Sequence, residues 1–212
     1  MINMVAATLF GNTPYINLPF NLIGWIGWFV LAALILWIVK KNFSLELRQG
    51  YWWAFGILAF TSFLAAVVFV INLPGLKAIP FPNIPQEIAY PMIQVFLAIP
   101  WIISAGLLGI WPTVLFAFLS GVLTALWGTH NVFTPLEYSI VGLLIALVLR
   151  QNYRSKPFTW LRSPLGAGIG VSILTTPVLL ITTFFSTNGN LAARLDFAFT
   201  QSWTGMLTMA VQ

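Results

Sequence analysis

Apolar stretches flanked by basic loops constrain the fold of this chain more than any other feature. Seven such stretches follow one another, and the short loops 40–48 and 150–162 between them hold seven of the nine Lys and Arg residues. In membrane proteins, short loops with such an excess of Lys and Arg face the cytoplasm. The pattern therefore predicts a protein that crosses a membrane several times, with both basic loops on the cytoplasmic side.

The composition excludes a water-exposed surface of the usual kind. The chain is 59% hydrophobic and 6% charged, whereas about 25% of the residues in a soluble domain are charged. In a bilayer the backbone must form its hydrogen bonds within helices or a closed barrel. The apolar stretches do not alternate and are longer than the roughly ten-residue strands of membrane barrels. The expected fold class is therefore an all-α transmembrane bundle.

Charge placement, cysteine content and missing motifs exclude several classes of function. The net charge of +5 lies beside apolar spans, which fits the positive-inside rule better than a nucleic-acid-binding surface. The chain has no cysteine, and therefore no disulfide, thiolate metal site or thiol nucleophile. The motifs of P-loop nucleotide binding, zinc proteases and serine hydrolases are also missing. We expect no catalytic residues, no metal site and no cofactor.

We expect about seven spans (six to seven) in one integral membrane domain that covers residues 1–212. The stretch 87–127 is divided in two, because a single span there would place the two basic loops on opposite sides of the membrane. The N-terminus is then outside and the C-terminus cytoplasmic. The last stretch has no basic stop or polar tail, so we expect the sequence to be the N-terminal part of a longer polypeptide. The predicted spans are Asn21–Val39, Tyr51–Leu73, Glu87–Gly109, Pro112–Trp127, Pro135–Leu149, Pro164–Phe185 and Leu191–Gln212.

Tryptophan and proline positions agree with these boundaries. Residues 74–86, between the second and third spans, contain four prolines and are predicted to be non-helical. Most tryptophans lie near predicted span ends, where indole rings favour the headgroup region of the bilayer. These are Trp25, Trp28, Trp37, Trp52, Trp53, Trp111, Trp127 and Trp160.

Glu137 has two interpretations. The stretch 134–137 reads T-x-x-E with proline at the first helical position, which is the pattern of a capping box, and Phe133 and Tyr138 could form the accompanying staple. An acid within a membrane span is otherwise a candidate for a ligand or proton site. We favour capping, and the two interpretations are compatible because a capping carboxylate at the outer rim can still face a cavity.

His130 is the only histidine and lies in the predicted outer turn 128–133. Its side chain ordinarily titrates near neutral pH, so it could sense pH on the outer side. We favour the alternative of a solvated loop histidine, because no Cys or paired carboxylate completes a metal site. The predicted ligand-binding site at the outer mouth of the bundle consists of Tyr90, Gln94, His130, Asn131 and Glu137.

Pro100 and Pro177 lie inside predicted spans. Proline removes a helix hydrogen bond and bends the axis, while hydroxyls such as those of Thr175 and Thr176 can bond the carbonyls that are freed. Each proline is interpreted as a static kink, which we favour, or as a hinge.

Small residues recur one helical turn apart in three of the predicted spans. Such pairs let helix backbones approach closely in lipid. We favour packing within the bundle, and a homodimer interface is the alternative. The pairs are Ala105 with Gly109, Gly121 with Ala125, and Gly166 with Gly170.

The segment from about Ala98 to Arg162 resembles a known family. It reads AIPWIISAGLLG, then WPTVLFAFLSGVLTALWGTHNVFTPLEYSIVGLLIALVLRQNYR, then PFTWLRSP. In the overall order of these segments it resembles the N-terminal multi-helix membrane module found ahead of cytoplasmic GAF and histidine-kinase regions in bacterial sensor proteins of Chloroflexota type. A loose small-residue pattern is also shared with the substrate-binding subunits of energy-coupling-factor vitamin transporters. The resemblance implies a sensory or anchoring domain of the bacterial cytoplasmic membrane, with any kinase activity outside these residues.

We therefore predict the input and anchoring domain of a bacterial two-component signalling protein, a domain that is not itself an enzyme. A ligand or a change in the bilayer would favour one of two helix packings, which the last span would transmit to a cytoplasmic domain. The alternatives are the substrate-binding membrane subunit of a vitamin-type transporter and a structural subunit of a membrane complex. The predicted partners are the lipid bilayer, a small-molecule ligand and, through the small-residue faces, a second copy of the chain; nucleic acid is excluded.

Overall fold

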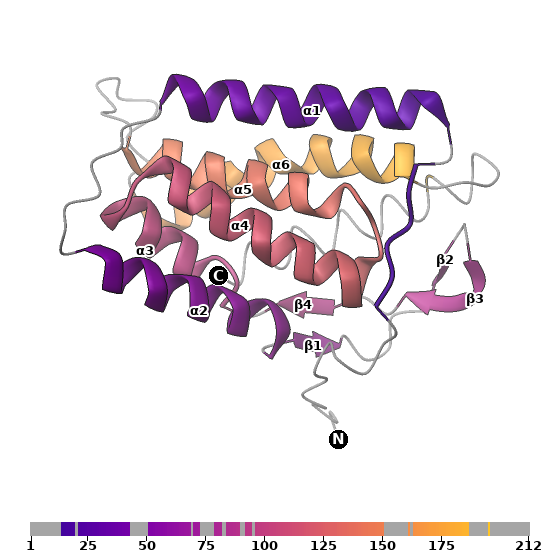
Figure 1. Ribbon diagram of the computed structural model, residues 1–212, viewed down its shortest axis with the longest axis horizontal. Coiled ribbons are helices and arrows are strands. Elements are labelled where there is room, and N and C mark those ends of the chain that lie inside the picture. Colours follow the sequence, from indigo (N-terminus) through magenta and orange to yellow (C-terminus); the bar gives the residue numbers. More distant parts are fainter. Residues whose placement is uncertain are drawn as a thin grey trace.

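The computed structural model shows a helical bundle (Figure 1). It describes residues 14–19, 21–42, 51–68, 70–72, 79–81, 84–89, 92–94, 96–150, 161, 163–186 and 195. The helices are α1 (Leu22–Lys41), α2 (Trp52–Val67), α3 (Ile99–Leu107), α4 (Ile110–Thr124), α5 (Thr134–Arg150) and α6 (Pro164–Ser186), and a π-helical turn, η3 (Ala125–Thr129), continues α4. Over the described residues, the architecture is helical as predicted, apart from two short pairs of strands.

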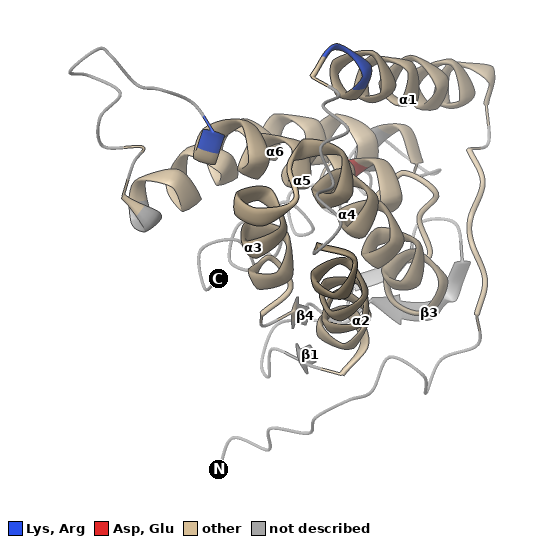
Figure 2. Cartoon of the chain, turned by 60° about the vertical axis from the view of Figure 1, so that its left-hand side comes forward, with Lys and Arg blue, Asp and Glu red and all other residues tan. Residues whose placement is uncertain are grey.

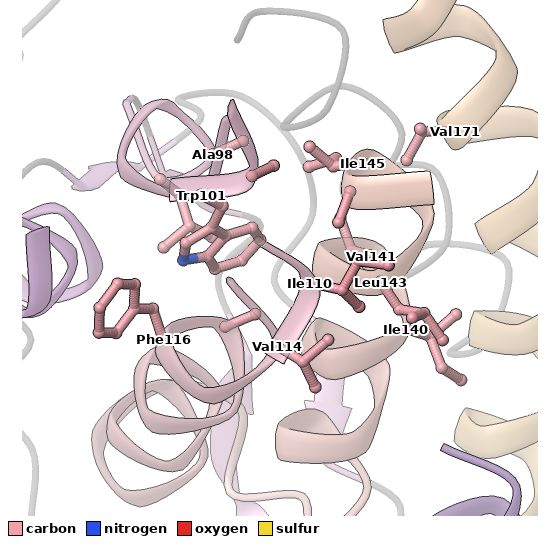
Figure 3. Close-up of a cluster of buried hydrophobic side chains, with 14 of the residues drawn as sticks. Ala98, Trp101, Ile110, Val114, Phe116, Ile140, Val141, Leu143, Ile145 and Val171 are labelled. Atoms are coloured by element: carbon pink, nitrogen blue, oxygen red, sulfur yellow. The ribbon is translucent and has the colours of Figure 1, made fainter. Parts of the chain in front are cut away.

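Helices α4 and α5 form the centre of the bundle. They make the most extensive contact of any two elements, with α2 and α3 packed on one side and α1 and α6 on the other (Figure 1). Buried apolar side chains of α3, α4 and α5 meet between these helices, as Figure 3 shows for Trp101, Val114 and Val141. Trp101 and Phe116 are fully buried. This apolar cluster fixes the positions of the helices that carry the polar groups described below.

Helix α1 has the length and composition of a membrane span. Asn21 caps its start, because the side-chain Oδ1 accepts a hydrogen bond from the Gly24 amide at 2.8 Å. Its last turn carries Lys40 and Lys41. The 20 residues rise about 30 Å, which matches the hydrocarbon thickness of a bilayer. In the described part of the chain, α1 and the continuous segment Ile110–Thr129 are long and apolar enough to cross a membrane.

The described basic side chains lie at one end of the bundle. The α1 start is tied to the start of α5, because Trp28 Nε1 donates to the Val132 carbonyl at 3.1 Å. Helices α1 and α5 therefore run in the same direction, and their ends carry Lys40, Lys41 and Arg150 (Figure 2). We name this the basic end. The opposite end, where η3 and residues 130–134 join α4 to α5, is named the corner end.

The predicted third span, Glu87–Gly109, is helical only in its second half. Strand β4 (Met92–Gln94) pairs antiparallel with β1 (Val70–Asn72), and β2 (Ile79–Phe81) pairs antiparallel with β3 (Ile84–Ala89). Helix α3 has nine residues, which rise about 14 Å, less than half the hydrocarbon thickness. The helix starts next to Pro100 because proline has no N–H to bond a preceding turn and its ring clashes with that turn. The prediction of a complete third span is wrong.

The division of residues 87–127 into two segments is confirmed. The break falls at Leu108 and Gly109, between α3 and α4. Gly109 has a φ of 107°, a conformation that favours glycine, and a Cβ there would lie 3.0 Å from Nη1 of Arg150. The turn therefore lies against the end of α5. The seventh predicted span, Leu191–Gln212, lies outside the described residues except for Leu195, and a total of seven spans remains a prediction.

Glycines allow α4 and α5 to touch at the level of the backbone. A Cβ on Gly121 would lie 2.6 Å from Cα of Pro135, and a Cβ on Gly142 would lie 2.7 Å from Cβ of Ala117. Both distances are shorter than real carbon contacts, so larger residues do not fit. Packing of the small-residue motif within the bundle is confirmed at Gly121, and the homodimer alternative remains a prediction.

Candidate functional site

Gln94 lies at the centre of a buried polar network near the corner end. Strand β4 ends at this residue, and its side chain is only 3% exposed. Its Nε2 donates to the Ala66 carbonyl and to Thr124 Oγ1, both at 2.9 Å. Its Oε1 accepts a hydrogen bond from the Tyr138 hydroxyl. One amide therefore joins α2, α4 and α5, which explains why a polar side chain is tolerated in this apolar surrounding.

The network continues along α4 toward α2. Thr124 Oγ1 donates to the Ser120 carbonyl at 3.0 Å, and Ser120 Oγ donates to the Ser62 carbonyl at 3.3 Å. The Tyr138 ring packs edge-on against Trp101, with ring centroids 5.7 Å apart. These contacts orient the Tyr138 hydroxyl toward Gln94. Of the predicted site residues, Gln94 is thus held most firmly.

His130 is buried, so the favoured prediction of a solvated loop histidine is wrong. It is 4% exposed, and its ring stacks on Tyr15 with centroids 3.8 Å apart and planes 5° apart. Its Nδ1 lies 3.0 Å from the Tyr15 carbonyl oxygen. His130 has a φ of 51°, in the left-handed region. Non-glycine residues adopt this conformation rarely and mostly where surrounding contacts impose it.

The contacts that impose it come from residues 14–19, which we name the strap. The Tyr15 amide donates to the Leu126 carbonyl at 3.1 Å, and the Asn17 amide donates to the His130 carbonyl at 2.8 Å. In return, the Val132 amide donates to the Asn17 carbonyl at 3.4 Å. The last carbonyls of a helix have no partner within the helix. The strap supplies donors to two carbonyls at the end of η3 and covers His130 at the same time.

Asn131 shapes the corner rather than facing a cavity. Its side-chain Oδ1 accepts a hydrogen bond from the Phe133 amide at 2.9 Å. Its carbonyl accepts one from the Thr134 amide at 3.1 Å. Asn131 is therefore the residue that prepares the start of α5, a role that the sequence pattern assigned to Thr134.

Glu137 does not form the favoured capping box. The Glu137 amide donates to the Phe133 carbonyl at 2.9 Å, and its carboxyl group accepts a hydrogen bond from the Thr182 hydroxyl on α6. The box fails because Thr134 is already helical and its amide is bonded to Asn131. Glu137 is 7% exposed and Thr182 3%. The acid therefore joins α5 to α6 inside the bundle.

The structure brings the predicted site residues to one end but in separate groups. Gln94 pairs with Tyr138, His130 with Tyr15, and Glu137 with Thr182. Tyr90 lies outside the described residues. The sequence reasoning missed Tyr15, Thr124, Tyr138 and Thr182 as members of these groups. Polar residues at intervals in apolar helices were a usable signal for Thr124 and Thr182, whereas nothing local to the sequence links Tyr15 to His130.

The two proline predictions have different outcomes. Pro100 lies in the first turn of α3, where proline is tolerated, so it does not kink the middle of a helix, and a hinge at Pro100 remains a prediction. Pro177 lies inside α6. The neighbouring hydroxyls of Thr175 and Thr176 donate to the carbonyls of Val171 and Ser172, at 2.9 and 2.7 Å. Such bonds to the preceding turn often bend helices, and a hinge at Pro177 remains a prediction.

A shallow apolar groove of about 260 Å³ lies between α2 and α4. It shares Ser62 and Ser120 with the polar network of Gln94, and the rest of its lining is apolar. The residues that line it are Ala59, Ser62, Phe63, Phe116, Leu119, Ser120, Val122 and Leu123.

Neither the described side chains nor comparison with known proteins indicates an enzyme or a family. Among the residues that the structure describes, no cluster of three or more His, Cys, Asp or Glu could hold a metal ion. The chain matches no protein-family model, no curated protein and no solved structure. Function must therefore be argued from the distribution of polar and apolar side chains.

Proposed function

We propose that this chain is a membrane-embedded sensory and anchoring domain of a bacterial signal-transduction protein. The observation that carries the proposal is the polarity of the bundle, which is apolar on the outside and polar inside its corner end. Lipid covers the outer surface, and the buried polar groups hold the helices in a packing that a signal can change.

The outer surface supports embedding in a bilayer. On α1, Leu22 is 76% exposed and Leu36 69%, and on α2 Trp53 is 84% exposed. Soluble monomers rarely expose contiguous apolar surface of this extent. A buried core helix is excluded for α1, since its side chains are largely exposed. Hydrocarbon chains of lipids are the solvent that suits such a surface.

The ends of the bundle support an orientation. Lys40, Lys41 and Arg150 at the basic end would face the cytoplasm, as short loops rich in Lys and Arg do. The exposed indoles of Trp37 and Trp52 lie in the last turn of α1 and the first turn of α2. That position suits the cytoplasmic headgroup region. The corner end, with the strap, His130 and Glu137, would then face outward.

The buried polar groups support a sensory role over a purely structural one. Hydrogen bonds of Gln94 and Glu137 join β4, α2, α4, α5 and α6 near the outer face. A fully satisfied network of this kind rigidifies the bundle and specifies one packing. A ligand or bilayer change acts by having different affinities for the two packings. Any output activity belongs to a cytoplasmic domain beyond these residues.

A reporter fusion tests this proposal. Residues 1–212 are placed ahead of a histidine-kinase core that lacks its own membrane domain, and autophosphorylation is measured in membrane vesicles. Gln94→Leu should change kinase activity by about fivefold or more, the range of ordinary coupling energies. Ile173→Leu is the control, since Ile173 is 58% exposed on α6. If the Gln94→Leu and Ile173→Leu fusions both insert in the membrane and both have the kinase activity of the parent fusion, the sensory role is overturned.

A second experiment tests the orientation. Because the chain has no cysteine, a single cysteine introduced at Asn42 or at Asn131 is the only thiol. A membrane-impermeant maleimide added to intact cells should label position 131 after the strap is loosened by Tyr15→Ala, and should not label position 42. Labelling at position 42 alone would reverse the orientation.

A further inference from the structure

The contact between Glu137 and Thr182 contains more hydrogen-bond acceptors than the Thr182 hydroxyl can serve. Thr182 Oγ1 lies in donor geometry to the Glu137 carboxyl group, to the Val178 carbonyl at 2.9 Å and to the Leu179 carbonyl at 3.2 Å. A threonine hydroxyl has one hydrogen. If that hydrogen goes to an ionised Glu137, the Val178 carbonyl receives none from it.

Protonation of Glu137 adds a second donor to this contact. A protonated carboxyl group has its own O–H donor. Glu137 then donates to Thr182 Oγ1, and the Thr182 hydrogen goes to the Val178 carbonyl. Each hydrogen has one acceptor, and no charge is left inside the bundle.

The surroundings of Glu137 offer no described cation to balance a carboxylate. Helices α4 and α6 contain no titratable residue, and α1 has its two lysines at the basic end. Among the described side chains, the titratable groups of the corner end are Tyr138, the next residue on α5, together with His130 and Tyr15. His130 is engaged with Tyr15 through ring stacking and its Nδ1. An ionised carboxylate in this position would be costly to bury.

We propose that Glu137 and Thr182 form a proton-binding site that controls the contact between α5 and α6. The two side chains are 7% and 3% exposed, so the closed site is shielded from solvent. Proton release leaves a buried charge, and the α5–α6 contact loosens at the corner end to let water reach the carboxylate. The inference rests on the proposed sensory function only in assigning the loosening a signalling consequence.

Infrared spectroscopy of the purified full chain in lipid vesicles tests the proton directly. A protonated carboxylic acid has a C=O stretching band that is distinct from the bands of a carboxylate. We expect such a band in the parent protein, a decrease of the band as pH rises, and its complete loss in Glu137→Gln. Glu87→Gln, which alters an acid on β3, is the matched control and should leave the band unchanged. Persistence of the band in Glu137→Gln would overturn the proposal.

Two more variants keep the test decisive if Glu137→Gln does not fold. Glu137→Asp retains a carboxylic acid and should keep the band at a shifted frequency. Thr182→Val removes the hydroxyl that accepts the hydrogen bond from the protonated carboxyl group, and should also shift the band. Unshifted bands in both variants would assign the proton to another acid and overturn the proposal.

Thermal unfolding of the same samples tests the loosening. The protonated form buries no charge and lets both side chains donate a hydrogen bond, so the stability from this site is present at low pH and is lost as pH rises. The unfolding temperature of the parent should fall with rising pH, and this dependence should be absent in Glu137→Gln and present in Glu87→Gln. If the unfolding temperatures of all three proteins depend equally on pH, the claim that protonation of Glu137 controls the α5–α6 contact is overturned. The infrared and unfolding measurements need no kinase. They can therefore contradict the proton-binding site while the reporter fusion supports the sensory function, and the reporter fusion can contradict the sensory function while they support the site.

Discussion

The α4–α5 pair and helix α1 solve the same packing problem in opposite ways. Helices α4 and α5 touch at the level of their backbones, because Gly121 and Gly142 have no Cβ and the facing helix occupies that space. Helix α1 contacts the bundle at a few positions, such as Gly24, which lies against Pro19 and Phe185, and the buried Ile35, whereas a Cβ on Gly27 would meet nothing within 4 Å. The α4–α5 pair is therefore closely packed, whereas α1 leaves most of its surface without protein contact.

The difference teaches what stabilises each part of a bundle in lipid. Apolar side chains gain little by leaving hydrocarbon for a protein interior, so helix association depends on close packing and on hydrogen bonds between helices. The α4–α5 pair has both, through its glycines and through Tyr138 and Gln94. Helix α1 has one described side-chain bond to the corner, from Trp28, and its remaining apolar surface suits lipid.

The largest expected contrast is between buried and exposed leucines. Leu143→Ala on α5, at a side chain 3% exposed, should lower the free energy of unfolding by about 3 kcal/mol because it leaves a cavity. Leu36→Ala on α1, at a side chain 69% exposed, should change it by less than about 0.5 kcal/mol. Denaturation in detergent micelles measures both. Similar losses would show that α1 packs as tightly as α5.

The next contrast is between two amides. Gln94→Leu should cost about 3 kcal/mol, because it leaves the Ala66 carbonyl and the Thr124 and Tyr138 hydroxyls without their partner. Asn42→Leu, at the exposed end of α1, removes a single bond to the Ile38 carbonyl and should cost about 0.5 kcal/mol. The same denaturation series compares them, and a loss at Asn42 as large as at Gln94 would contradict the central role of the network.

Alanine at two glycines should give effects of opposite sign. Gly121→Ala places a methyl group 2.6 Å from Cα of Pro135 and should destabilise by about 2 kcal/mol through overpacking. Gly27→Ala meets no neighbour and should stabilise by up to about 1 kcal/mol, since alanine is the better helix former. Unfolding temperatures give the sign directly. A gain of stability at Gly121 would mean that α4 and α5 are less closely packed than described.

The smallest expected effect concerns the start of α1. Asn21→Ala removes the cap bond to the Gly24 amide and should cost about 1 kcal/mol. Because α1 is loosely attached, the loss should be local, with faster amide hydrogen exchange in the first turn of α1 and unchanged exchange in α5. Faster exchange in both helices would show that α1 and the centre of the bundle open together.

The helices that could be predicted from the sequence are those whose ends have local signals. The predicted spans 21–39, 112–127, 135–149 and 164–185 differ from α1, α4 with η3, α5 and α6 by a few residues. Continuous apolar runs give the length, and basic residues, glycine or proline mark the ends. The third span failed because apolar composition does not distinguish a helix from strands that pair with distant residues, as β4 does with β1.

The candidate site depended on contacts that are not local. Gln94 and Glu137 could be selected because a polar side chain in an apolar stretch requires a partner. Their partners Tyr138 and Thr182 follow from helix packing, which the sequence pattern does not give. The capping prediction for Glu137 failed because α5 already includes Thr134, whose amide is bonded to the Asn131 carbonyl. The exposure predicted for His130 failed because the strap that covers it lies far away in the sequence.

The strap also has a consequence for the order in which the chain assembles. Tyr15 and His130 are 115 residues apart in sequence, and chains are synthesised from the N-terminus at about 5–20 residues per second. Helix α1 therefore leaves the ribosome well before α4, η3 and α5 exist to receive the strap. In the proposed bilayer, lipid surrounds most of α1 during that interval, which suits a helix whose residues from Leu22 to Val39 are all apolar. Docking of the strap on the corner is thus a late step, because it requires that η3 and the start of α5 are already in place.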